Sequence, residues 1–203
     1  MERGDRRFPF AIESISKVAT LALALEQFAP DVVQRKLGAD PTGLPFDSVA
    51  ALELHGDRPH GPLVTAGAIV TVSLLKAQGP QDRCSQILAL QGRLAGRSVG
   101  LSDTVNQSEQ TTNADNRAIA WLLCSAGTLY CDPMETCDVY TCQCSTWITC
   151  LDLAVMGATW ANARTNPLTH EQVLTLANEP PLWAEMTTEG LDETSGDWDF
   201  RVG

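Results

Sequence analysis

Ser14 and Lys17 are the pair in this sequence whose types and spacing are best suited to chemistry. Three residues apart on a helix, both lie on one face. A lysine in an apolar setting loses basicity through desolvation and can take the serine proton, which leaves a nucleophile for acyl transfer. A helix N-terminus beside Ser14 favours the negative charge that develops in such a reaction. The same spacing recurs at Ser73 and Lys76, so a capping serine beside a surface lysine remains the alternative.

The elements that must position this pair are predominantly helices joined by short turns. A proline after Ala29 ends the first helix, and Gly38 closes the second. Asp132 followed by Pro133 predicts a capped helix start. Thr169 and Gln172, which have the spacing of a capping box, predict another. Residues 198–202 have the composition of a short strand. The expected helices are residues 15–28, 31–37, 66–77, 83–95, 118–123, 134–143 and 149–163.

Length and charge limit the classes of protein that fit. The 203 residues predict one domain, residues 1–203. Fourteen Lys and Arg against 25 Asp and Glu give a net charge of −11, which disfavours nucleic acid and anionic membrane as partners. No apolar run reaches the 18 residues of a membrane span. Residues 180–203 are strongly acidic, which indicates a solvated and loosely ordered segment.

The cysteines suggest no cofactor. Six of the seven crowd into residues 124–150, but their gaps match no zinc-binding pattern and no histidine lies among them. We therefore expect free buried thiols, no metal and no cofactor, with a zinc site as the outside alternative. The N-terminal segment loosely imitates a secretory signal, yet Pro9, Glu13 and Glu26 interrupt it, so we expect a cytoplasmic protein.

Collinear motifs along nearly the whole chain resemble the serine-dependent glutaminases, which are relatives of the β-lactamase and penicillin-binding group. The motifs that carry this resemblance are residues 8–17 (FPFAIESISK), 38–46 (GADPTGLPF), 58–60 (RPH), 66–70 (AGAIV), 108–109 (SE), 116–120 (NRAIA), 143–145 (QCS), 152–156 (DLAVM) and 166–169 (NPLT).

The resemblance implies hydrolysis of L-glutamine to L-glutamate and ammonia through an acyl-enzyme. Ser14 is then the nucleophile, Lys17 its base, and Tyr140 the family tyrosine that assists proton transfer. Glu109 pairs with the substrate ammonium and Asn116 with the substrate carboxylate, as suits their chemistry. Without the resemblance, we would interpret Tyr140 as a core aromatic residue, Glu109 as a solvated side chain and Asn116 as a helix cap.

The implied fold is α+β, predominantly helical and β-lactamase/transpeptidase-like, with an incomplete antiparallel sheet. Family members begin before residue 8 and continue past residue 203 into a Lys-Ser-Gly motif and a glycine-rich strand, so we expect a chain truncated at both ends. Two substrate-binding positions depart from the family: Thr65 replaces an asparagine and Asp192 replaces a tyrosine. Gly61 also replaces a usual asparagine, and Trp147 lies in an altered segment.

Two readings of function follow from these matches and departures. The first is a glutaminase, a hydrolase of linear amides in glutamine metabolism, which forms a homo-oligomer. The second is a catalytically inactive remnant that serves as an interaction or oligomerisation module. A β-lactamase-like hydrolase shares the Ser-x-x-Lys arrangement, but Glu109 and Asn116 favour an amino-acid substrate.

Overall fold

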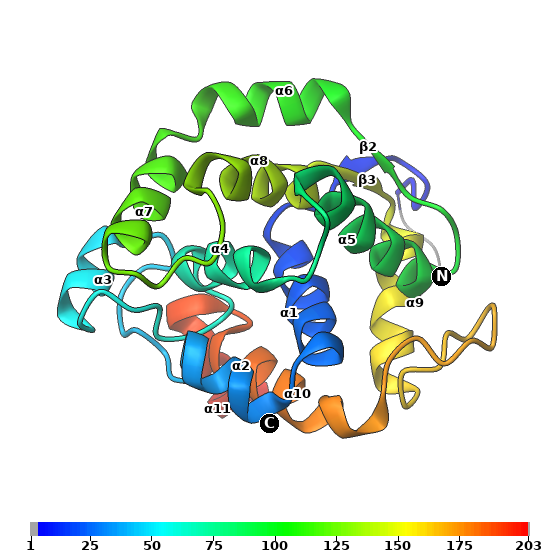
Figure 1. Cartoon of the computed structure of the whole chain (residues 1–203). Coiled ribbons are helices and arrows are strands. Elements are labelled where there is room, and N and C mark those ends of the chain that lie inside the picture. The colour runs from blue at the N-terminus through cyan, green and yellow to red at the C-terminus, as the bar shows by residue number, and fades with distance from the viewer. Residues whose placement is uncertain (1–3, 203) are drawn as a thin grey trace.

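The computed structural model describes residues 4–202, and helix α1 (Ser16–Gln27) lies at its centre (Figure 1). Eight of the twelve residues in α1 are buried, among them Leu21 and Leu25. The helix ends before Pro30, as the sequence predicts, because a residue that precedes proline avoids the helical conformation. Helices α4, α5, α8 and α10 pack around α1. The helix that follows Ser14 is therefore held from several sides.

The remaining helices surround α1, some within the core and some on the outside. Every residue of α4 is buried, so α4 is a core helix rather than an amphipathic one. Helix α6 has no buried residue and lies across α8 on the outside (Figure 1). The helices are α2 (Pro30–Leu37), α3 (Val49–Leu54), α4 (Thr65–Leu74), α5 (Pro80–Ala95), α6 (Asp103–Thr112), α7 (Ala114–Ser125), α8 (Pro133–Cys144), α9 (Cys150–Ala161), α10 (Glu179–Glu189) and α11 (Ser195–Val202), with short 3₁₀ turns η1 (Glu13–Ile15), η2 (Leu176–Asn178) and η3 (Asp192–Thr194).

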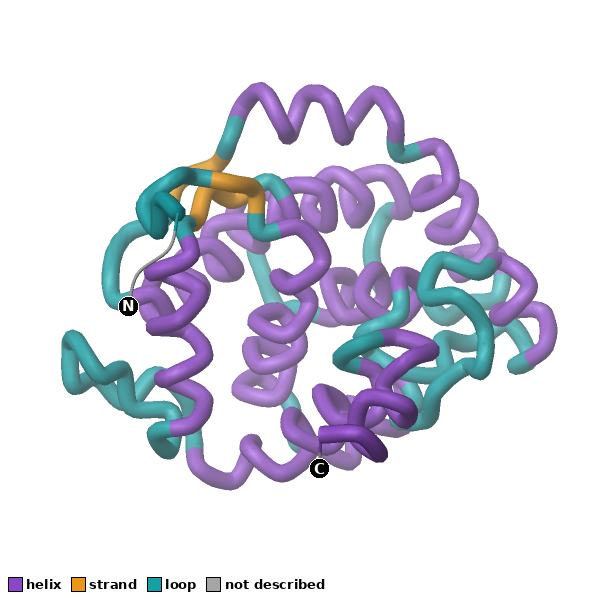
Figure 2. The backbone as a smooth tube through the Cα atoms, turned by 180° about the vertical axis from the view of Figure 1, so that it is seen from behind, coloured by secondary structure: helices purple, strands orange, loops and turns teal. Residues whose placement is uncertain are grey.

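A small antiparallel sheet lies at one end of the molecule (Figure 2). Its strands are β1 (Phe10–Ala11), β2 (Gly100–Leu101) and β3 (Thr146–Ile148), with β3 in the middle. Trp147 lies opposite both Ala11 and Gly100. The sheet thus joins the segment before Ser14 to the end of α8. This arrangement confirms the expected fold class, predominantly helical with a short antiparallel sheet.

Capping residues explain where several helices begin. The Asp132 side chain accepts the backbone N–H groups of Met134 and Glu135, which confirms the predicted start of α8. Thr149 and Asp152 form a reciprocal capping box at the start of α9.

Two expectations about local structure are wrong, and some helices were not expected. No helix follows Thr169, because the chain there forms a turn closed by a Thr165–Gln172 bridge. Residues 198–202 are the end of helix α11 and not a strand, and α11 packs against α10. The sequence patterns also missed α6, whose polar residues show no apolar periodicity.

The cysteines differ from the expected set of free buried thiols. Cys84 on α5 and Cys142 on α8 form a disulfide. Cys137 and Cys144 are free and buried, whereas the free thiols of Cys124, Cys131 and Cys150 are partly or fully exposed. The expectation fails because pairing depends on the approach of two helices that lie 58 residues apart in sequence.

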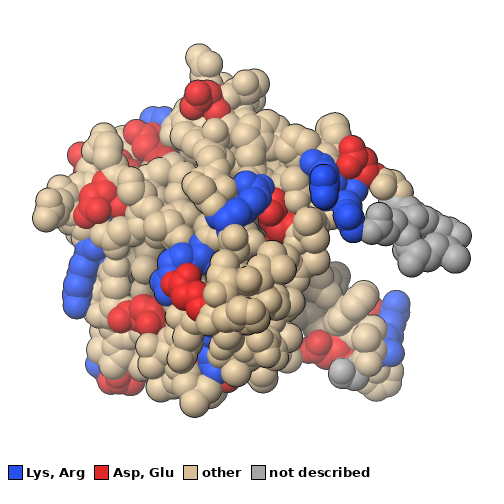
Figure 3. All heavy atoms as spheres, turned by 90° about the vertical axis from the view of Figure 1, so that its right-hand side faces the viewer, with Lys and Arg blue, Asp and Glu red and all other residues tan. Residues whose placement is uncertain are grey.

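Charged residues of both signs are scattered over the face seen in Figure 3 rather than gathered into one patch. Within residues 4–202, no helix is long and apolar enough to cross a membrane. The same residues contain no group of three or more His, Cys, Asp or Glu arranged to hold a metal ion.

A buried ion pair anchors α10, the helix that forms one wall of the site described below. Arg164, whose side chain is 2% exposed, pairs with Glu179 and donates to the carbonyl of Leu176. We expect Arg164→Met to lower the free energy of unfolding by about 3 kcal/mol, because it leaves Glu179 without its partner. Urea denaturation measures the loss. An Arg35→Met control, which removes an exposed ion pair with Asp31, should change it by less than about 1 kcal/mol.

Candidate active site

The sheet and the turn η1 hold Ser14 at the start of α1. The N–H of Ile12 donates to the carbonyl of Thr146 on β3 at 2.9 Å, which fixes the chain two residues before Ser14. Glu13 has φ of 51°, a backbone conformation that residues other than glycine adopt at a cost. Ser14 is exposed and lies in η1, immediately before α1. Such strain is often found where a structure fixes a functional side chain.

Lys17 lies one turn further along, with its side chain buried. The residue is 4% exposed, and burial lowers the pKa of its ammonium. The charges of Asp192 and Glu189 oppose this shift in pKa. The Phe46 ring lies 5.1 Å from Nζ, so an aromatic face covers the amine. These surroundings are those in which a lysine can act as a base.

Tyr140 on α8 brings a phenol to the same place. The side chains of Ser14 and Thr65 lie close enough to its hydroxyl to act on the pKa of the phenol. The residue is 5% exposed, and burial together with the nearby Cys144 raises the pKa of the phenol well above its usual value. Tyr140 is therefore a neutral proton donor at physiological pH. The structure thus brings Ser14, Thr65 and Tyr140 together.

The two residues expected to bind the ammonium and the carboxylate of the substrate lie on the neighbouring helices α6 and α7. Glu109 is half-buried. Burial raises the pKa of Glu13, the residue before Ser14, and the charge of Glu109 adds to this rise. Asn116 is half-buried near the start of α7, and its carbonyl accepts from the thiol of Cys137, one turn before Tyr140. Neither lines the cleft described next.

An open cleft of about 790 Å³ runs beside Ser14 and Lys17. Its other wall is the C-terminal part of the chain, from Trp183 on α10 to Trp198 on α11. Asp192 lines this cleft, and its charge acts on Lys17. A carboxylate thus stands where the resemblance implies a tyrosine. The volume is sufficient for an amino acid, since ligand sites are typically about 300–1,000 Å³.

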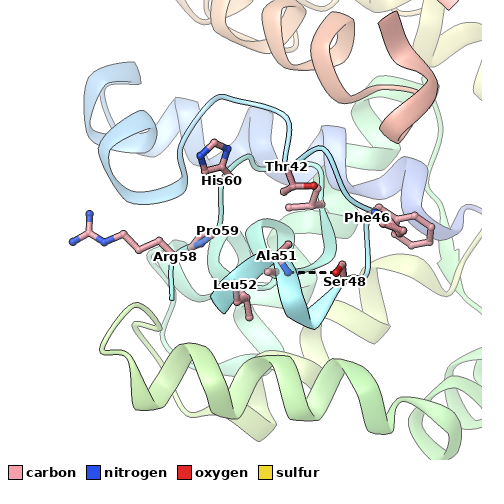
Figure 4. A pocket seen from close by; sticks show the side chains of 11 residues that line it. Thr42, Phe46, Ser48, Ala51, Leu52, Arg58, Pro59 and His60 are labelled. Atoms are coloured by element: carbon pink, nitrogen blue, oxygen red, sulfur yellow. Dashed lines mark hydrogen bonds between the residues drawn. The ribbon is translucent and has the colours of Figure 1, made fainter. Parts of the chain in front are cut away.

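A second, much smaller pocket supports the residues that cover Lys17 (Figure 4). It holds about 10 Å³, room for no more than a water molecule. The Ser48 side chain accepts the N–H of Ala51 there, which caps α3. The carbonyl of Phe46, another lining residue, accepts the N–H of Thr65 at 2.8 Å. The pocket therefore belongs to the framework of the site and does not bind substrate.

Two residues of the site were not singled out from the sequence. Cys144 is buried between Ser16, whose Oγ lies 3.6 Å from Sγ, and Tyr140. Its motif, residues 143–145, was the available signal. Glu189 is 3% exposed and lines the cleft, although the acidic segment around it predicts solvated side chains. No pattern in the sequence distinguishes it from its acidic neighbours.

Comparison with known proteins agrees with this geometry. The family model described as Glutaminase matches residues 1–203. Glutaminase 1 of Escherichia coli K12 is 62% identical over 98% of this chain, and the glutaminase of Mycobacterium ulcerans is 57% identical over the same share. These matches span 64% and 62% of the two relatives, so the chain covers under two thirds of their length.

Solved structures give the same result. The probable glutaminase YbaS superposes with a TM-score of 0.97 at 62% identity, over 99% of this chain and 65% of that one. A covalent complex of the Bacillus subtilis glutaminase YbgJ with 5-oxo-L-norleucine superposes with a TM-score of 0.86 at 27% identity, over 98% of this chain and 63% of that one. The family match along the whole chain, together with the high identity to these proteins, shows that the chain belongs to the glutaminase family.

Proposed function

We propose that this chain carries a glutaminase active site and hydrolyses L-glutamine to L-glutamate and ammonia through an acyl-enzyme on Ser14. The observation that carries the proposal is the grouping of the exposed Ser14 hydroxyl, the buried amine of Lys17 and the Tyr140 phenol in a member of this family. The covalent complex that the related glutaminase YbgJ forms with 5-oxo-L-norleucine supports a nucleophilic mechanism.

The first chemical step transfers the acyl group to serine. Neutral Lys17 takes the proton of the Ser14 hydroxyl, and Oγ forms a bond to the side-chain carbonyl carbon of glutamine. The Tyr140 hydroxyl, beside Ser14, passes the proton from the Lys17 ammonium to the leaving nitrogen, and the C–N bond breaks to release ammonia. Water then attacks the ester, returns a proton to Ser14 and releases glutamate.

The substrate's amino-acid end is held by charge complementarity. Glu109 pairs with the ammonium, and Asn116 donates its amide to the carboxylate. The Thr65 side chain is shorter than the asparagine that the family has at this position, so it reaches less far toward the substrate. Asp192 adds a carboxylate to the lining of the cleft. The carboxylate of Asp192 disfavours substrates that would place a negative charge next to it.

A second candidate function is an inactive, self-associating module, and Thr65 and Asp192 favour it. We further propose that residues 1–203 act as one domain, that the protein forms a homo-oligomer, and that it acts in the cytoplasm. Large apolar side chains on α7 are consistent with self-association, since Trp121 is 55% exposed and Leu122 44%.

Ammonia release by the purified 203-residue chain tests the proposed function. We expect turnover of L-glutamine and at least about tenfold slower turnover of L-asparagine, because the shorter side chain cannot reach Ser14 while its amino-acid end is held. A folded sample that releases no ammonia from either amide supports the inactive module instead.

Tyr140→Phe should lower kcat for L-glutamine by about 10²-fold, because the ring is kept and only the proton donor is lost. The KM should change little, since the phenol acts on the departing nitrogen rather than on the amino-acid end. Steady-state kinetics measure both constants. A variant with unchanged kcat removes Tyr140 from the mechanism.

A further inference from the structure

Glu189, the last residue of α10, is buried against the cleft in a way that its local hydrogen bonds do not explain. It is 3% exposed and lines the cleft with Ser14 and Lys17. One carboxylate oxygen accepts the N–H of Leu63 at 3.2 Å, while the other has no hydrogen-bond partner. Burying such an oxygen is costly, so its place beside the amine calls for a compensating interaction.

Gly61 makes room for this carboxylate. A Cβ atom at residue 61 would lie 2.2 Å from Oε2 of Glu189, far inside contact distance. The resemblance to glutaminases implies an asparagine at this position, and an asparagine side chain cannot occupy the space that Glu189 fills. A side chain at residue 61 would therefore displace the Glu189 carboxylate from its present place.

Lys17 lines the same cleft and is a cation whose charge acts on this carboxylate. The charge of Glu189 opposes the lowering of the Lys17 pKa by burial, and Lys17 in turn opposes the rise of the Glu189 pKa, which burial brings to about 7. Other titratable groups face the pair from several elements. The charges of Cys144, Asp192 and Asp47 also act on the pKa of Lys17, and those of His60 and Asp192 act on the pKa of Glu189. Glu189 in turn raises the pKa of the neighbouring Glu185.

We propose that Glu189 is a positioning residue for Lys17, whose carboxylate holds the ammonium that forms when Lys17 accepts the Ser14 proton. This inference rests on the proposed function. In the step concerned, the proton moves from Oγ of Ser14 to Nζ of Lys17, and the electron pair left on Oγ forms the bond to the substrate carbon. Above a pH of about 7, the value to which burial brings its pKa, Glu189 is ionised and keeps its charge through this step, as the acid of a Ser-His-Asp triad does beside its histidinium.

Titration of Lys17 by NMR tests the pairing without requiring turnover. The chain has only three lysines, Lys17, Lys36 and Lys76, so ¹³Cε labelling of lysine gives three resolvable signals. In Glu189→Gln we expect the midpoint for Lys17 to move to lower pH by roughly half a unit or more, because the ammonium loses a stabilising charge. An unchanged midpoint overturns the proposal.

Glu185→Gln is the matched control. Glu185 is 7% exposed, lies one turn earlier on α10 and also has an unpartnered oxygen, but its charge is not among those that act on Lys17. We expect its variant to leave the Lys17 midpoint in place. Equal shifts in both variants mean that any loss of a buried carboxylate on α10 disturbs the site, which contradicts a specific role for Glu189.

Gly61→Ala provides a second variant that leaves Glu189 intact but displaces its carboxylate, and it should shift the Lys17 midpoint in the same direction. In steady-state kinetics, Glu189→Gln and Gly61→Ala should each lower kcat about tenfold with KM nearly unchanged. The reason is that the interaction between Glu189 and Lys17 strengthens only as the ammonium forms. If the wild-type chain releases no ammonia, the proposed function fails while the NMR result still decides the Lys17–Glu189 pairing.

Discussion

We expect Ser14→Ala to lower ammonia release from L-glutamine by on the order of 10³–10⁶-fold, because it removes the oxygen that forms the proposed acyl-enzyme. The side chain is exposed at the cleft and fills no core space, so the free energy of unfolding should change by less than about 0.5 kcal/mol. Coupled ammonia assays and urea denaturation of the same preparation measure both quantities.

The chain offers an internal control in its second Ser-x-x-Lys match. Ser73 lies on the buried helix α4, where its hydroxyl donates to the carbonyl of Val70 and accepts the N–H of Tyr130. Ser73→Ala should lower the free energy of unfolding by about 1–2 kcal/mol and leave the rate within about twofold of wild type. Loss of turnover in Ser73→Ala alone, with Ser14→Ala active, reverses the assignment.

Lys17→Met lowers kcat by about 10²–10⁴-fold, because the nucleophile loses its base while the buried volume is kept. We expect the double variant with Ser14→Ala to be no slower than the more impaired single variant, since the two residues act as a unit. Additive losses would show that Lys17 acts in some other way than by activating Ser14. Single- and double-variant kinetics under one set of conditions decide between these outcomes.

The same substitution should not destabilise the fold below about pH 7. Burial lowers the pKa of Lys17 in the folded state, so the unfolded chain binds the proton more tightly, and the wild-type protein gains stability as pH rises toward the pKa of an unfolded lysine, about 10.4. Methionine removes this pH dependence. Glu189, whose pKa burial brings to about 7, can take a proton when the ammonium is absent, so we expect Lys17→Met to be at least as stable as wild type below that pH, by urea denaturation. A large destabilisation there would mean that burial of the ammonium costs little.

Local sequence signals predicted much of the helical framework. Proline after residue 29 and the Asp132 cap mark helix ends through steric and hydrogen-bonding rules that act within a few residues. The Ser14–Lys17 spacing likewise depends only on helix geometry, whereas burial of the lysine became known only from the folded chain. These predictions need no knowledge of what lies across the core.

Features that depend on distant segments could not be predicted in this way. The disulfide between Cys84 and Cys142 depends on how α5 packs against α8. The space that the Glu189 carboxylate occupies is open because residue 61, 128 residues earlier, is a glycine, and residues 198–202 belong to a helix that packs against α10. Glutamates in an acidic run are solvated by default, so only the folded chain distinguishes Glu189.

Covalent labelling with 6-diazo-5-oxo-L-norleucine tests most directly whether Ser14 is the nucleophile, since the related glutaminase YbgJ reacts with this compound. Wild-type chain and Ser14→Ala are incubated with the reagent and digested for peptide mass spectrometry, with L-glutamate as the protecting ligand. We expect one adduct per chain on Ser14, slowed by glutamate and absent from Ser14→Ala. An adduct on any other residue, or no adduct in a chain that turns over glutamine, contradicts the assignment.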